Sequence, residues 1–125
     1  MPKLSRETAE VDDLGIAEDR HGEVGDYTVD FTTIRQDMDL APLLKGLPDD
    51  SCQCPHWGYM IKGKIVARYG DHEEVYETGD AFYLAPGHIP MAEAGSEFVQ
   101  FSPTSELAAL LEHMQENMRK LEGAA

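Results

Sequence analysis

A short apolar segment in the second half of the chain lies between two turn signals. Its sequence is Gly79-Asp80-Ala81-Phe82-Tyr83-Leu84-Ala85-Pro86-Gly87-His88. Glycine and proline interrupt regular structure, so the apolar residues between them predict a short strand that ends in a rigid turn. His88 lies in that turn, where prolines on both sides restrict the backbone. The segment therefore places a metal-binding type of side chain at the end of a hydrophobic strand.

Similar short strands are predicted on both sides of this segment. They are separated by glycines or turn residues and cover residues 57–61, 65–69, 74–77 and 97–101. Strands this short, at intervals of about 8–12 residues, are typical of an antiparallel sandwich or a small barrel. Further upstream, Tyr27, Val29 and Phe31 alternate with Thr28 and Asp30, which predicts a half-buried strand.

The two ends of the chain differ from this β-rich middle part. Residues 1–24 are polar and acidic, and we expect a partly ordered arm with a short strand near residues 14–16. Residues 25–103 are expected to form the β-domain, with a short helical turn or an apolar loop at 40–47.

A helix is predicted at the C-terminus. Residues 104–125 make up its length, and they are preceded by Ser102 as the N-cap and Pro103 at the first helical position. Its apolar residues recur at helical spacing and form one stripe, which we interpret as a core or dimer contact. The stripe consists of Leu107, Leu110, Leu111, Met114, Met118 and Leu121.

Length and charge limit the class of protein. The 125 residues fit one domain, and 10 basic against 24 acidic residues give a net charge of −14 with histidine neutral. Such a charge repels phosphate, so we expect no nucleic-acid partner and no anionic membrane surface as a partner. No apolar run approaches the roughly 20 residues of a membrane helix, and the N-terminus lacks the apolar region of a signal peptide. We therefore expect a cytoplasmic protein.

The densest group of metal-binding residue types lies between Cys52 and His56. Alternation places Cys52, Cys54 and His56 on one face of an extended segment. On a straight strand Cys52 and His56 would be roughly 13 Å apart, so both reach one ion only if the backbone bends, and Pro55 permits a bend. A further ligand must come from elsewhere, and His88 is the best candidate. The alternative for the two cysteines is that they are buried structural thiols; a disulfide between them would close almost no loop.

At these residues the chain resembles the cupin superfamily. Residues 59–63 look like the aromatic–aliphatic strand and glycine of the first cupin motif. Residues 79–88 are similar to the second motif, which begins with Gly-Asp and ends in a Pro-Gly turn with a histidine. The resemblance covers roughly residues 27–102, and residues 54–59 also look like a stretch of uncharacterised actinobacterial single-domain cupins. It implies a mainly β fold: a cupin-type antiparallel β-barrel (double-stranded β-helix or jelly roll) with a metal in its mouth, and often a homodimer.

The sequence departs from the ligand pattern of that family. It has no His-x-His motif, and the family's ligand positions can be carried over only to Cys52 and His56, with changed chemistry. The histidine of the second motif would fall near Pro90, two residues after His88. We therefore predict a metal set drawn from Cys52, Cys54, His56 and His88, in which Cys54 and His88 are inferred from strand facing and proximity.

The chemistry of this set suggests a function. Mixed thiolate and imidazole ligands favour zinc, iron or copper. Four protein ligands would close the site, whereas three would leave one position open for water or substrate. We expect Trp57, Tyr59 and Tyr83 to contribute to the pocket around a small molecule.

The resulting prediction is a small metal-binding cupin that binds or acts on a small molecule. As an enzyme it would be a metal-dependent oxygenase, isomerase or lyase. Two alternatives stay open: a ligand-sensing or metal-sensing binding module without turnover, and a metal-free barrel in which the cysteines and histidines only pack.

Overall fold

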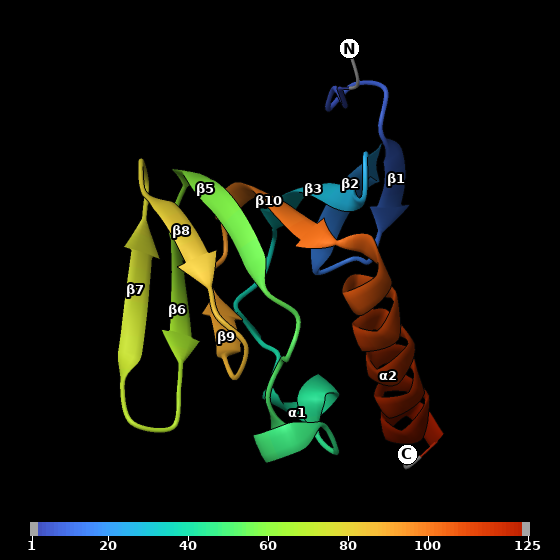
Figure 1. Cartoon of the computed structure of the whole chain (residues 1–125), viewed down its shortest axis with the longest axis vertical. Coiled ribbons are helices and arrows are strands. Elements are labelled where there is room, and N and C mark those ends of the chain that lie inside the picture. Colours follow the sequence, from blue (N-terminus) through green and yellow to red (C-terminus); the bar gives the residue numbers. More distant parts are fainter. Residues whose placement is uncertain (1–2, 124–125) are drawn as a thin grey trace.

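The computed structural model describes residues 3–123, which form two antiparallel β-sheets with helices at one end (Figure 1). The larger sheet contains, in spatial order, β1 (Glu10–Asp13), β2 (Ala17–Val24), β3 (Tyr27–Ile34), β10 (Glu97–Pro103), β5 (His56–Lys62) and β8 (Ala81–Leu84). The smaller sheet contains β4 (Met38–Asp39), β9 (Ile89–Ala92), β6 (Lys64–Arg68) and β7 (Glu73–Glu77). The helices are α1 (Ala41–Leu44), a 3₁₀ turn (Pro48–Asp50) and α2 (Thr104–Gly123).

The chain crosses between the two sheets in the manner of a jelly roll, so the predicted mainly β architecture with a C-terminal helix is confirmed. Figure 1 shows one such crossing, where β5 of the larger sheet leads directly into β6 of the smaller one. Within residues 3–123 no ladder of paired strands joins the sheets, so they face each other without closing into a continuous barrel.

The main hydrophobic core lies between the two sheets and draws on both. Met60 of β5 and Ala67 of β6 are fully buried in it. Side chains alternate across a strand, so burying Met60 and His56 on one face of β5 leaves Trp57 and Tyr59 on the other. The remaining buried members of this core are Ala17, Ile34, Ile65, Phe82, Leu84 and Phe98.

A second, smaller core forms where α2 packs against α1. Leu107 and Leu110 of α2 are buried there with Leu44 of α1, and Met114 packs against them. The predicted core role of the apolar stripe is confirmed for these residues, whereas the rest of the stripe is exposed: Leu111, Met118 and Leu121. No helix among residues 3–123 is long and apolar enough to cross a membrane.

The start of α2 differs from the expectation. The helix begins at Thr104, and both Ser102 and Pro103 belong to β10. The reason is strand pairing, because β10 continues its ladder with β3 as far as the pair Pro103 and Tyr27. Ser102 is therefore fully buried inside the sheet and is not a helix cap.

The N-terminal region also differs from the expectation. Residues 10–24 form β1 and β2, which extend the larger sheet beyond β3. The expected strand near residues 14–16 is wrong, because these residues form the turn that joins β1 to β2. Gly15 adopts φ +80° there, and its N–H donates to the Asp13 carboxylate at 2.9 Å. The helical turn expected within residues 40–47 is confirmed as α1.

Candidate metal centre

Cys52 and His88 are held side by side by their backbones. The Cys52 N–H donates to the His88 carbonyl at 2.8 Å, and the Gly87 N–H donates to the Cys52 carbonyl at 2.7 Å. These bonds form an isolated antiparallel bridge between the loop that precedes β5 and the loop that precedes β9. Two positions 36 residues apart in the sequence are thereby fixed as neighbours.

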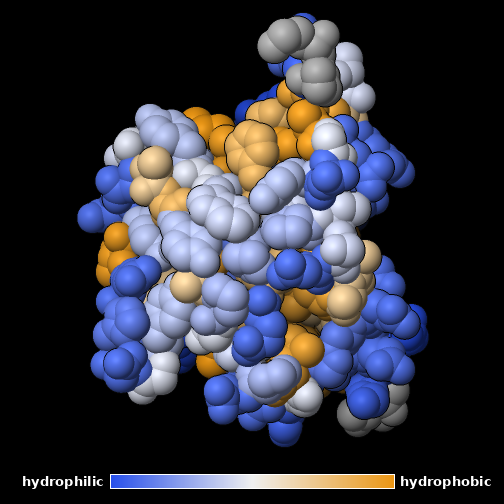
Figure 2. Space-filling view, in the orientation of Figure 1, coloured by the Kyte–Doolittle hydropathy of each residue, from blue (hydrophilic) through white to orange (hydrophobic). Residues whose placement is uncertain are grey.

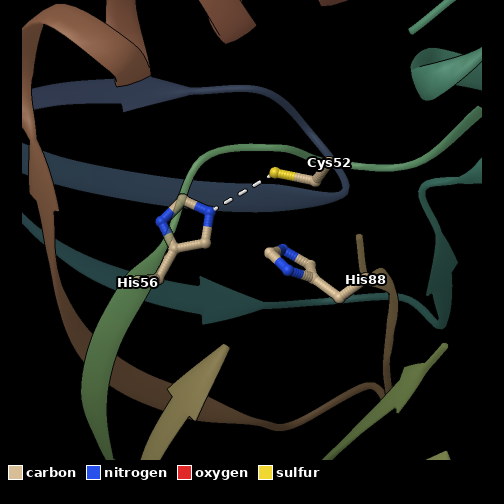
Figure 3. Close-up of side chains that lie close together, drawn as sticks. All are labelled: Cys52, His56 and His88. Carbon is tan, nitrogen blue, oxygen red and sulfur yellow. Dashed lines mark hydrogen bonds between the residues drawn. The ribbon is translucent and has the colours of Figure 1, made fainter. Parts of the chain in front are cut away.

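His56 joins this pair from the first residue of β5. Residues 53–55 are not in a strand, so the chain turns between Cys52 and His56 and brings both side chains to one place. The Cys52 Sγ lies 3.6 Å from the His56 Nε2. Figure 3 shows the two imidazole rings and the thiol converging from separate segments. One ligand atom from each of the three residues lies within 4.8 Å of the others.

The second ring nitrogen of each histidine is held by a hydrogen bond. The His88 Nδ1–H donates to the Ala85 carbonyl at 2.6 Å, because a carbonyl can only accept. In the neutral ring the His88 Nε2 then carries a lone pair, and this buried atom has no hydrogen-bond partner. The His56 Nδ1 lies 2.6 Å from the buried Ser102 hydroxyl. Such contacts fix the orientation of metal-binding imidazoles.

Burial sets the protonation of all three groups. It lowers the pKa of His56 to about 3, with a smaller contribution from nearby His88, and it also lowers the pKa of His88. Burial raises the pKa of the Cys52 thiol to about 11. Without a cation the group is therefore two neutral imidazoles and a protonated thiol, and a cation would favour the thiolate.

Cys54 lies outside this group of three. It is buried in the smaller core, and its Sγ–H donates to the Pro55 carbonyl at 3.5 Å. Burial, with the nearby Cys52 thiol as a smaller cause, raises its pKa to about 12. Both cysteines are free, as the sequence indicates. Of the four expected ligands, the structure brings together Cys52, His56 and His88.

The three residues line one pocket of about 240 Å³ between the sheets. Both sheets contribute its walls, and α2 closes one side with Leu107, Leu110, Leu111 and Met114. Most of the remaining lining is apolar, including Ile34, Leu84 and Phe98. The ligand-type atoms of Cys52, His56 and His88 therefore face a small, mostly apolar space.

Trp57, Tyr59 and Tyr83 lie on the outer face of the larger sheet instead of in this pocket. Their exposed fractions are 40%, 46% and 47%, and Trp57 stacks on Tyr83 with ring centroids 5.1 Å apart. The cause is the alternation along β5 and β8, where the neighbours of these residues face the core. In Figure 2 weakly polar and apolar side chains gather over this side of the molecule, with strongly hydrophilic residues around them.

Two carboxyl groups of the pocket were not expected from the sequence. Asp19 of β2 and Asp30 of β3 both line it, and Asp30 is buried. Alternation along β3 puts Asp30 on the other face of the strand from Tyr27, Val29 and Phe31, and the sequence predicts that the apolar residues face the core; the structure buries both Val29 and Asp30. Asp19 also belongs to a partly exposed group in which the His21 Nε2 lies 2.9 Å from the Asp12 carboxylate.

Comparison with known proteins supports the fold. No family model matches the sequence, and no curated protein matches it. An RmlC-like cupin from Shewanella frigidimarina matches the structure with a TM-score of 0.55 and 16% identity, covering 80% of this chain and 88% of that one. KdgF from Halomonas matches with a TM-score of 0.52 and 14% identity, covering 79% and 92%.

The polyketide cyclase RemF from Streptomyces resistomycificus matches with a TM-score of 0.57 and 10% identity, covering 82% of this chain and 79% of that one. These likenesses show that the fold of this chain is cupin-like, as the resemblance predicted.

Proposed function

We propose that this protein holds one divalent transition metal through Cys52, His56 and His88, and that it binds or transforms a small molecule in the adjoining pocket. The observation that carries the proposal is the His88 Nε2, which is buried and has no hydrogen-bond partner. A buried polar atom without a partner costs about 1–3 kcal/mol. A metal bound by this nitrogen and by its neighbours Cys52 Sγ and His56 Nε2 would remove that cost.

The donor set indicates which metals fit. One thiolate and two imidazoles suit zinc, iron or copper better than magnesium or calcium, which prefer oxygen ligands. Three protein ligands are typical of sites that keep one coordination position open. A metal bound there would supply Lewis acidity and an attachment point for one donor atom of a ligand.

The protein's own residues would prepare the site. Ala85 fixes the tautomer of His88, and Ser102 orients His56 through its Nδ1. The mostly apolar walls offer water few hydrogen-bond partners, and a lower local polarity strengthens electrostatic interactions inside the pocket. With a volume of about 240 Å³, the pocket suits a molecule at the small end of the range that protein pockets accept.

We further propose that the protein catalyses a reaction and does not merely bind its ligand. An open coordination position beside a mostly apolar pocket suits a reaction of the oxygenase, isomerase or lyase type, and one protein of similar fold, RemF, is a polyketide cyclase. A binding module would keep the metal and the ligand but release the ligand unchanged. The homodimer implied by the resemblance also remains a proposal, and the exposed residues of the apolar stripe on α2, Leu111, Met118 and Leu121, are the surface that it would use.

The two cysteines provide a matched test of the metal site. Their exposed fractions are 2% and 3%, so Cys52→Ser and Cys54→Ser disturb equally buried positions. We expect about one zinc or iron per chain in the wild type and in Cys54→Ser, measured by elemental analysis. Cys52→Ser should bind zinc more than about 100-fold more weakly, because loss of a ligand exceeds the effect of losing a residue that orients one.

A cobalt titration adds a direct signature. Cobalt bound to a thiolate gives a charge-transfer band in the near ultraviolet, which should be present in Cys54→Ser and absent in Cys52→Ser. Circular dichroism checks that both variants are folded. Equal metal binding by the two variants, or loss of metal from Cys54→Ser alone, would contradict the proposed ligand set.

A further inference from the structure

We propose that Asp19 and Asp30 form a carboxyl pair that selects the ligand: the pocket takes small, mainly apolar molecules that carry a hydroxyl or amine donor, and it rejects anionic ones. This inference rests on the proposed function, because it concerns the small molecule that the same pocket would hold. It adds a second polar site to the pocket, separate from Cys52, His56 and His88, which we call the metal group.

The positions of the two residues place them on one face of the larger sheet. In the pairing of β2 with β3, Asp19 is opposite Thr32 and Asp30 is opposite His21, so the two aspartates are diagonal neighbours. Both line the pocket, and Asp30 has an exposed fraction of only 8%. The Thr32 hydroxyl donates to the Asp19 carboxylate at 3.1 Å, which holds that carboxylate in place.

The pair lies at a distance from the metal group that one small molecule can span. In the sheet, β10 separates β3 from β5, so the backbones of Asp30 and the metal-binding strand are two strand spacings apart, about 9–10 Å. Gln100 of β10 is paired with both strands and also lines the pocket. The space between the two polar points is bounded by apolar side chains such as Ile34 and Phe98.

Charge decides what the pair accepts. Burial and the neighbouring Asp19 charge raise the pKa of Asp30 to about 8, so near neutral pH Asp30 mostly keeps its proton and the negative charge of the pair lies on Asp19. His21, Asp12 and the Cys54 thiol are the other titratable groups near the pair. Among the described residues that line the pocket there is no lysine or arginine to offset the charge. A carboxylate or phosphate would meet repulsion, whereas a hydroxyl or an amine would find an acceptor.

A second feature of the same pocket indicates that a ligand enters it. The His88 Nε2 is buried, has no partner, and belongs to a side chain that lines the pocket with Asp30. With a metal held by Cys52, His56 and His88 at one point and a carboxyl pair at another, the pocket suits an elongated molecule with polar atoms at both ends. The apolar lining between these points suits a hydrocarbon or aromatic middle.

Three probes of nearly equal shape test the selection: benzyl alcohol, benzylamine and benzoate. Their binding is measured by nuclear magnetic resonance titration of the metal-free protein, so that benzoate cannot gain affinity by coordinating a metal. We expect benzyl alcohol and benzylamine to bind at least tenfold more tightly than benzoate. In the double variant Asp19→Asn/Asp30→Asn, which is neutral at the pair, this ratio should fall to threefold or less. The control Asp26→Asn removes an exposed carboxylate and should keep the wild-type ratio.

The outcomes separate this inference from the metal proposal. Zinc affinity of the double variant, measured in parallel, should equal that of the wild type within about twofold. Benzoate binding as tight as benzylamine in the wild type, or no binding of either donor probe in the millimolar range, overturns the selection. Failure of the wild type to bind zinc while the probe ratio is retained overturns the metal proposal and leaves the selection in place.

Discussion

Hydrogen bonds at Nδ1 orient the imidazole rings of His56 and His88. The Ala85 carbonyl holds one ring and the Ser102 hydroxyl holds the other, both at 2.6 Å. A backbone carbonyl cannot be removed by substitution, but the hydroxyl can. Ser102 is therefore the residue at which the contribution of ligand orientation can be measured.

We predict that Ser102→Ala weakens zinc binding by about 10- to 100-fold, the usual effect of losing a residue that orients a ligand. Ser96→Ala is the matched control. Ser96 is equally buried, but its hydroxyl bonds to the backbone of Lys64, away from the metal group. Ser102→Ala loses one hydrogen bond of a buried hydroxyl and Ser96→Ala loses two, yet only Ser102→Ala should lose metal affinity, as measured by competition with a chelator. Zinc affinity of Ser102→Ala within twofold of the control would refute the orienting role.

For individual residues, the sequence predicts part of the metal group from residue types and from their positions in the chain. Cys52, His56 and His88 were among the candidates because thiols and imidazoles are the ligands that transition metals prefer. Cys54 was included because alternation in an extended segment put it beside them. Residues 53–55 are not extended strand, so alternation does not apply there. Asp30 was missed because the buried face of a strand depends on the partners that cover it.

Among the secondary-structure elements, the crossing from β5 to β6 depends on one glycine. Gly63 adopts φ +94°, and a Cβ atom at this position would lie 2.6 Å from the Cα of Ser96, with the Ser96 hydroxyl closer still. Gly79 adopts a similar φ of +92°, but a Cβ atom there would meet nothing within 4 Å. A side chain at either position would therefore strain the backbone, but only a side chain at Gly63 would also clash with Ser96.

We predict that Gly79→Ala destabilises the protein by about 1–2 kcal/mol, the cost of a left-handed conformation for a residue with a Cβ. Gly63→Ala adds a clash with backbone that cannot move aside, and it should cost about 3 kcal/mol or more. Urea denaturation followed by circular dichroism measures both free energies of unfolding. Equal losses in the two variants would show that the close approach to Ser96 has no energetic effect.

The central strands were predictable because each combines an apolar face with a glycine or proline boundary. The N-terminal strands were not, since β1 is exposed along its whole length and β2 is mostly half-exposed. A strand of that kind carries no hydrophobic period, and its position is set by pairing with β3. The start of α2 was misplaced for a related reason, because Ser102 and Pro103 are held in β10 by the same neighbour.

For the molecule as a whole, the sequence predicts a strongly negative surface but not the carboxyl groups placed inside. Burial is the largest cause that raises the pKa of both Asp19 and Asp30, in Asp30 to about 8. In the unfolded chain an aspartate loses its proton near pH 3.9. Between these values the folded protein holds a proton that the unfolded chain has released. Stability must then fall as the pH rises through this window.

We predict that the free energy of unfolding of the wild type, relative to Asp30→Asn, decreases between pH 5 and pH 8. The steepest slope should approach about 1.4 kcal/mol per pH unit for one proton. The comparison between variants cancels the contribution of the exposed acids, and Asp26→Asn serves as the exposed control. Urea denaturation at several pH values gives the slope. A difference between wild type and Asp30→Asn that does not change with pH would show that Asp30 is ionised in the folded protein.

The placement of Trp57 has a practical consequence for spectroscopy. It is the single tryptophan of the chain, and it stacks on Tyr83 outside the sheet while its neighbour His56 faces inward. Its emission therefore originates from a surface that a molecule in the pocket does not touch. Unfolding of β5 or β8, or another chain covering that surface, would alter the fluorescence, whereas filling the pocket would leave it nearly constant. The protein thus carries an intrinsic optical reporter that can distinguish loss of structure from occupancy of the interior.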